Sequence, residues 1–220
     1  MATVTSSVTP IHGTCTIGQP YGNPSTGYTC GFHTGVDFPK SQMDSYNIYS
    51  VCSGTVIKNV TGVTGRTPAL GNECDVQRDG DGLVFRFCHM ENGSNNHLSV
   101  GQHVDTSTYI GIVGNTGNSY GPHLHLECST TASWNCNTFL NPGEQLGFGN
   151  TRGTVIVYDG GTPPPPPPPP PPVPVDTPIG PFYHRLFNGK WFWSTEPGYT
   201  GSLEDGSRKT ENAKYIWEYL

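Results

Sequence analysis

The sequence predicts a mainly β protein that carries a second, smaller module at its carboxyl end. Glycine is abundant, with 29 residues among 220, and only 13% of the residues are charged. No long segment before residue 150 has the apolar period of a helix. Ten consecutive prolines at 163–172 divide the chain. These observations indicate a loop-rich β domain, a stiff spacer and a short appendage.

Short β-branched or aromatic runs bounded by Gly, Asn and Asp predict the individual strands. Two clear examples are residues 54–60 (GTVIKNV) and 83–87 (LVFRF). Asp-Gly pairs within 79–82 are typical of hairpin turns and precede the second run. A later run at 154–158 (TVIVY) predicts a last strand or tail before the prolines.

The proline run sets the predicted domain boundaries. We expect a first domain over 1–150, a polyproline linker over 151–178 and a small module over 179–220. Ten prolines in a polyproline II helix span about 30 Å, which keeps two domains apart. The last module is dense in Phe, Tyr and Trp. These rings either fill a small core or form a surface that grips a polymer.

Composition excludes some partners. The net charge of −6 and the lack of a basic cluster argue against nucleic acid. No run of about 18 apolar residues exists, so no membrane span is expected. The first residues (MATVT) lack the basic and apolar regions of a secretory signal. We expect a monomer.

Two short stretches hold the residues that a zinc hydrolase needs. They are residues 32–37 (FHTGVD) and 121–125 (GPHLH). A catalytic zinc is usually bound by three protein ligands, with the fourth position left to water. His123 and His125 lie at i and i+2, so in a strand they project from the same face. One of them can bind metal while the other moves protons.

These stretches belong to four blocks that resemble the lysostaphin-type zinc endopeptidases. This family, also called M23 or LytM, cuts peptide cross-links in bacterial cell wall. The resemblance covers roughly residues 10–145, in family order. The blocks are residues 33–38 (HTGVDF), 53–56 (SGTV), 87–90 (FCHM) and 111–127 (GIVGNTGNSYGPHLHLE).

The resemblance implies a role for five residues. His33, Asp37 and His125 match the zinc ligands of the family. His89 and His123 match its two catalytic histidines. Bound Zn²⁺ lowers the pKa of its water and polarises the scissile carbonyl. No H-E-x-x-H helix supplies a glutamate base, so a histidine is expected to do so. Which of the two catalytic histidines is the base stays open.

The resemblance also implies an antiparallel β-sheet crossed by a loop-walled groove. Loops 59–75 and 129–137 are the expected walls. Tyr120 stands where the family usually has Thr, and Cys88 stands where a small residue is common. Both departures concern substrate preference, since neither removes a ligand.

Seven cysteines lie from Cys15 to Cys136. So many cysteines are unusual in a protein that stays in a reducing cytosol, so we expect disulfides. Two loops are candidates for closure, one between Cys15 and Cys30 and one between Cys128 and Cys136. The odd count leaves at least one free thiol. A cysteine nucleophile at Cys88 is the competing interpretation.

The sequence therefore predicts a zinc-dependent peptidoglycan endopeptidase that hydrolyses amide bonds in the peptide stem or cross-bridge. The terminal module is expected to bind the wall, and a phage lysin is the expected origin. Such a protein reaches the wall after release from the host cytoplasm by a holin, or on a virion. The alternative is a non-enzymatic wall-binding or virion structural protein on the same fold.

Overall fold

The computed structural model describes residues 2–160, 177–179, 182–187, 190–194 and 217–219. It is mainly β with antiparallel sheets, which confirms the predicted fold class. The chain forms two compact units, Met1–Pro165 and Pro166–Leu220. No helix of the described part is long and apolar enough to cross a membrane.

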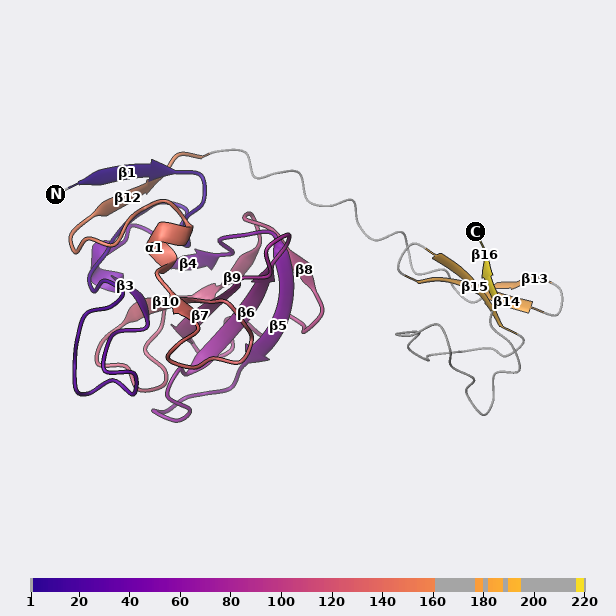
Figure 1. Ribbon diagram of the computed structural model, residues 1–220, viewed down its shortest axis with the longest axis horizontal. Coiled ribbons are helices and arrows are strands. Elements are labelled where there is room, and N and C mark those ends of the chain that lie inside the picture. Colours follow the sequence, from indigo (N-terminus) through magenta and orange to yellow (C-terminus); the bar gives the residue numbers. More distant parts are fainter. Residues whose placement is uncertain (1, 161–176, 180–181, 188–189, 195–216, 220) are drawn as a thin grey trace. The chain divides into compact units, whose positions relative to one another are not determined.

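A seven-stranded antiparallel sheet forms the centre of the first unit (Figure 1). Its strand order is β11-β10-β7-β6-β5-β8, and β3 also pairs with β10. The strands are β3 (Gly35–Pro39), β5 (Gly54–Val60), β6 (Asn72–Arg78), β7 (Val84–Met90), β8 (His103–Val104), β10 (His123–Ser129) and β11 (Phe139–Leu140).

Two smaller sheets complete this unit. One has the order β1-β12-β2, in which β12 pairs in parallel with β1 and antiparallel with β2. The other joins β4 and β9. The elements are β1 (Thr3–Ser6), β2 (Thr14–Thr16), η1 (Lys40–Gln42), β4 (Asn47–Tyr49), β9 (Tyr109–Ile112), α1 (Pro142–Gln145) and β12 (Val155–Tyr158). Because β12 pairs with the amino-terminal strands, the unit extends past the predicted boundary at residue 150.

The core lies on one face of the central sheet because side chains alternate along its strands. In β7, Phe85 and Phe87 are fully buried in the hydrophobic core. Leu124 and Leu126 of β10 join them there. The intervening residues of both strands, such as Arg86, are polar and face the opposite side. One pair of strands thus supplies both the core and the floor of a polar site.

The structure corrects the predicted cysteine pairing. A single disulfide is found among the described residues, between Cys30 and Cys136. Cys15 and Cys128, each expected to close a short loop, are free and fully buried. Their prediction was wrong because both lie on strands whose side chains point into the core. Burial also raises the pKa of Cys88 well above its usual value, which argues against a thiolate nucleophile there.

The carboxyl-terminal unit contains a four-stranded antiparallel sheet in the order β13-β14-β15-β16. Its strands are β13 (Thr177–Ile179), β14 (Phe182–Phe187), β15 (Lys190–Ser194) and β16 (Trp217–Tyr219). The proline run at 163–172 lies outside the described residues, so the predicted linker stays a prediction.

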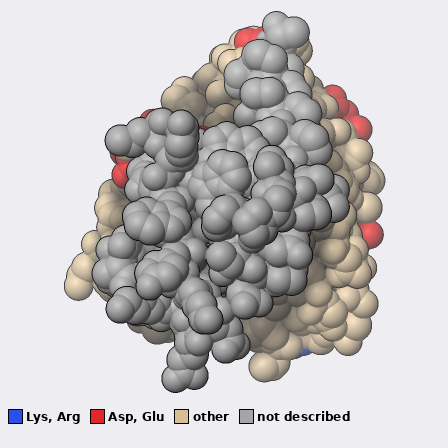
Figure 2. All heavy atoms as spheres, turned by 90° about the vertical axis from the view of Figure 1, so that its right-hand side faces the viewer, with Lys and Arg blue, Asp and Glu red and all other residues tan. Residues whose placement is uncertain are grey.

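The described surface seen in Figure 2 is acidic at its edges. Asp and Glu side chains appear at several points of this visible margin. This agrees with the net charge of −6.

Candidate metal centre and active site

Three neighbouring strands and the loop that enters β3 bring together the five residues that the sequence predicts for the site. On β10, His123 and His125 project from one face, and His125 lies opposite Asp37 of β3. His33 lies in the loop that enters β3. His89 is near the end of β7 and has a positive φ of 62°. This rare backbone conformation places its ring beside those of His123 and His125, with centroids 4.8 and 5.8 Å away.

The atoms of three side chains form a compact cluster that fits zinc. His33 Nε2 lies 3.1 Å from Asp37 Oδ1 and 3.1 Å from His125 Nδ1, and the last two atoms are 2.7 Å apart. Tetrahedral ligands at about 2.1 Å from zinc lie about 3.4 Å from one another. Among the described residues, these three form the group whose ligand atoms could hold a metal ion.

The outer nitrogen of each histidine ligand is also engaged. His33 Nδ1 donates to the carbonyl oxygen of Pro20 at 2.9 Å. His125 Nε2 donates to Glu127 Oε1 at 3.1 Å. These hydrogen bonds fix the tautomers, so that the inner nitrogens carry a lone pair for the metal. Both the set of ligands and the hydrogen bonds that support them therefore fit zinc.

Glu127 belongs to a buried polar network that the sequence analysis did not assign. It accepts a hydrogen bond from Thr34 Oγ1 at 2.5 Å and lies 3.3 Å from Arg86. Arg86 in turn forms a two-pronged contact with Asp75, at 2.9 and 3.1 Å. Since residues 123, 125 and 127 share a strand face, the pattern H-x-H-x-E already carried the signal for Glu127.

Burial and contacts between charged groups shift the pKa values of Asp37, His125 and the neighbouring Glu127. Burial raises the pKa of Asp37, but its contacts with His125 and His33 prevail and hold that pKa well below its usual value. Likewise, burial raises the pKa of Glu127, yet His125 and Thr34 hold it at about 2. Burial lowers the pKa of His125, and contacts with both carboxylates raise it to about 10. The buried carboxylates of Asp37 and Glu127 both contact the imidazole of His125, so they favour a positive charge at this site. A bound dication would supply that charge.

The two remaining histidines are held by backbone carbonyl groups. His89 Nδ1 donates to Thr116 O at 2.7 Å, and His123 Nδ1 donates to Gly121 O at 2.7 Å. His123 Nε2 lies 3.6 Å from Asp37 Oδ1, so it faces the metal cluster. Burial, with the nearby His125 and His123, lowers the pKa of His89 to about 4, which keeps His89 neutral at neutral pH.

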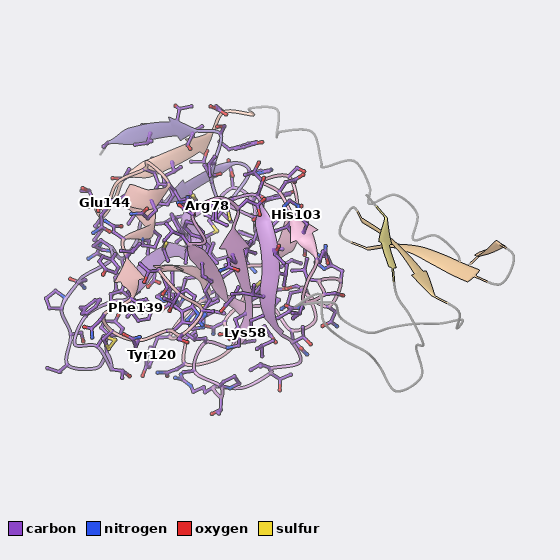
Figure 3. The ribbon with its side chains drawn as sticks, turned by 45° about the vertical axis from the view of Figure 1, so that its right-hand side comes forward. Lys58, Arg78, His103, Tyr120, Phe139 and Glu144 are labelled. Atoms are coloured by element: carbon purple, nitrogen blue, oxygen red, sulfur yellow. A yellow bond between two sulfur atoms is a disulfide. The ribbon has the colours of Figure 1, made fainter. Side chains whose placement is uncertain are left out.

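The site opens into a groove of about 1680 Å³. As expected, loop 59–75 contributes lining residues at 69–70, and loop 129–137 contributes those at 134–136. A third wall comes from residues 25–30, which the sequence analysis did not anticipate. Tyr120 lies at the rim with 87% of its surface exposed. Figure 3 shows Tyr120 and another lining residue, Phe139, on the same side of the unit.

A cluster of two histidines and an aspartate, with two further histidines beside it in an open groove, defines a metal-dependent hydrolase. Residues 31–138 match the family described as peptidase family M23. The chain belongs to this family of zinc-dependent metallo-endopeptidases, as its motifs predict.

Several solved structures are similar to this chain. The catalytic domain of the antimicrobial peptidase lysostaphin from Staphylococcus simulans is 28% identical, over 59% of this chain and 90% of that one, with a TM-score of 0.47. A single-substitution mutant of the catalytic domain of the prophage-encoded M23 protein EnpA from Enterococcus faecalis is 25% identical, over 58% and 88%, with a TM-score of 0.43. A zinc containing peptidase from Vibrio cholerae is 24% identical, over 57% and 35%, with a TM-score of 0.42.

Proposed function

We propose that this metallo-endopeptidase acts on peptidoglycan and hydrolyses an amide bond in its peptide stem or cross-bridge. His33, Asp37 and His125 hold the zinc, and His89 and His123 serve the reaction. The observation that carries the proposal is the cluster of three ligand atoms 2.7–3.1 Å apart on the floor of an open groove.

We infer separate roles for the two catalytic histidines from the position of His123 and from the pKa of His89. When bound, zinc activates water and polarises the scissile carbonyl. His123 keeps Nδ1 on Gly121, which leaves Nε2 beside the metal cluster to take a proton from water and pass it to the leaving amine. Burial lowers the pKa of His89 to about 4, so its ring is neutral and suits orienting the water through its unprotonated Nε2. We therefore assign the base to His123.

The charges of the groove favour a substrate that carries carboxylates. The two carboxylates among its lining residues, Asp37 and Glu127, are both engaged by histidine. Arg152 also lines the groove, is exposed and has no ion pair with another described residue. An unneutralised guanidinium attracts a carboxylate of a peptide stem but gains nothing from an uncharged glycine bridge. We propose cleavage next to the acidic stem.

The test is mass spectrometry of fragments released from purified peptidoglycan, with and without a zinc chelator. We expect chelator-sensitive new amino termini, and their sequence identifies the bond. Walls with and without glycine bridges form the matched pair for the charge argument. Release only from glycine bridges refutes the preference for the stem. No release from any wall with zinc present favours the alternative, a non-enzymatic wall-binding or virion structural protein.

The finer organisation is also proposed. Residues 1–150 with β12 form the peptidase domain, the linker lies within 151–178, and residues 179–220 bind the wall. The hypothesis of a phage lysin is tested by producing the protein inside bacteria with and without a holin. Lysis that requires the holin supports it, and lysis without the holin contradicts it.

A further inference from the structure

Trp134 is half-buried in the wall of the groove and packs against the polar network of Arg86 and Asp75. Its ring lies 3.6 Å from the guanidinium carbon of Arg86, a close cation–π contact. Its indole Nε1 donates to Asp75 Oδ2 at 3.1 Å, the same carboxylate that Arg86 contacts. Trp134 is thus fixed both to the cation and to the anion of this pair.

The network leads from Trp134 to a predicted zinc ligand in few steps. Arg86 Nη1 reaches Glu127 Oε2 at 3.3 Å, and these residues are direct neighbours in the register of β7 and β10. The other oxygen of Glu127 accepts the hydrogen bond from His125. Arg86 therefore holds the carboxylate of Glu127 in place, and Glu127 in turn holds the imidazole of His125.

The disulfide connects this network to a second ligand. Cys136 follows Trp134 by two residues, and its partner Cys30 precedes His33 by three. The backbone hydrogen bonds of the loop that carries Trp134 are local, such as that from Thr138 N to the carbonyl of Asn135. The bridge is the covalent restraint on that loop.

We propose that Trp134 and Arg86 are positioning residues of the metal centre, and that the Cys30–Cys136 disulfide holds Trp134 in place. This inference rests on the proposed metal site. Trp134 excludes water from Arg86, and exclusion of water strengthens the contact between Arg86 and Glu127. A fixed Glu127 keeps the His125 ring oriented for the metal, since supporting carboxylates of this kind control metal affinity.

The experiment measures the rate at which the zinc-loaded full chain loses zinc to a chromogenic chelator. Replacing the carboxylate itself, Glu127→Gln, is expected to weaken zinc binding by about 10- to 100-fold. Trp134→Ala is expected to speed zinc loss by about five- to tenfold. Trp134→Phe retains a ring over Arg86 and should restore part of the effect.

Arg78→Lys provides the matched control for Arg86→Lys. Arg78 also pairs with an aspartate and lies over an aromatic ring, at 5.2 Å from the ring of Phe85, but it has no contact with Glu127 or the metal cluster. We expect Arg86→Lys to speed zinc loss and Arg78→Lys to leave it unchanged. Equal effects of the two variants overturn the proposal, because a general loss of stability then explains them.

The role of the disulfide is tested by a double-mutant cycle. Cys30→Ser/Cys136→Ser should speed zinc loss about as much as Trp134→Ala, and combining both should add little. Additive effects, or wild-type zinc loss in Trp134→Ala, refute the inference. Failure of the wild-type protein to bind zinc refutes the proposed function instead, so the two failures are distinguishable.

Discussion

Replacing Cys30 and Cys136 by serine opens a covalent loop that encloses all five predicted site residues. The disulfide joins positions separated by 106 residues. In the chain-entropy treatment, closing a loop of this length restricts the unfolded chain by about 16 cal/mol/K, or about 4.8 kcal/mol at 25 °C. A unit of this size gains about 2–4 °C per kcal/mol, so we expect its melting temperature to fall by about 10–19 °C.

Hydrogen exchange of peptides from β6, β7 and β10 is the suitable assay, because it reports the unfolding free energy of the first unit alone. Tryptophan fluorescence is less specific, since three of the four tryptophans lie beyond residue 160. Zinc must be saturating in both proteins. Reductant should lower the wild type to the level of the variant and leave the variant unchanged. A loss below about 2 kcal/mol, the lower end for a native disulfide, refutes the reasoning.

Three further predictions concern the ligands, pH and the terminal module. His33→Ala or Asp37→Ala should abolish bound zinc and peptidase activity together, whereas His123→Ala should abolish turnover and retain most zinc; metal analysis of the purified variants checks this. Burial lowers the pKa of His12, which stacks between two tyrosine rings, so the unfolded state binds its proton more readily. Its contribution to stability is therefore complete above its unfolded pKa of about 6.5 and is lost as the pH falls toward the lower folded value; denaturant unfolding of His12→Phe should show a weaker loss over that range. Truncation after Gly161 should leave hydrolysis of soluble peptides intact and weaken hydrolysis of whole walls, and equal activity on walls would contradict a wall-binding module.

The sequence was sufficient to predict that the side chains of the candidate metal site lie together, because its motifs are local. Alternation along a strand puts His123 and His125 on one face, whatever the rest of the fold does. His33 and Asp37 are four residues apart at the entry to one strand, so they also meet through local geometry. The strands of the central sheet were predictable for the same reason, as β-branched and aromatic runs end at Gly, Asn and Asp.

The remaining features depend on which distant segments meet. Cys30 pairs with Cys136 because the fold brings two lining segments of the groove together, and spacing along the chain carries no signal of this. The contact of Arg86 with Glu127 depends on the register between β7 and β10, which are about 40 residues apart in the sequence. The parallel pairing of β1 with β12 joins the two ends of the unit. The alternation of apolar and polar residues predicts each strand, but it does not predict which strand pairs with it.

The alternation of β7 and β10 also explains why this site can be rigid without a large supporting structure. Leu124 and Leu126 anchor β10 in the core, and they alternate with His123, His125 and Glu127 on the polar face. The position of each polar side chain is therefore set by the packing of its apolar neighbours, which tolerates little displacement. Two of the three proposed ligands, Asp37 and His125, lie on strands, which position side chains more precisely than loops do. Substitutions on the apolar face should therefore reduce stability first, and those on the polar face should reduce zinc binding or turnover while the fold persists.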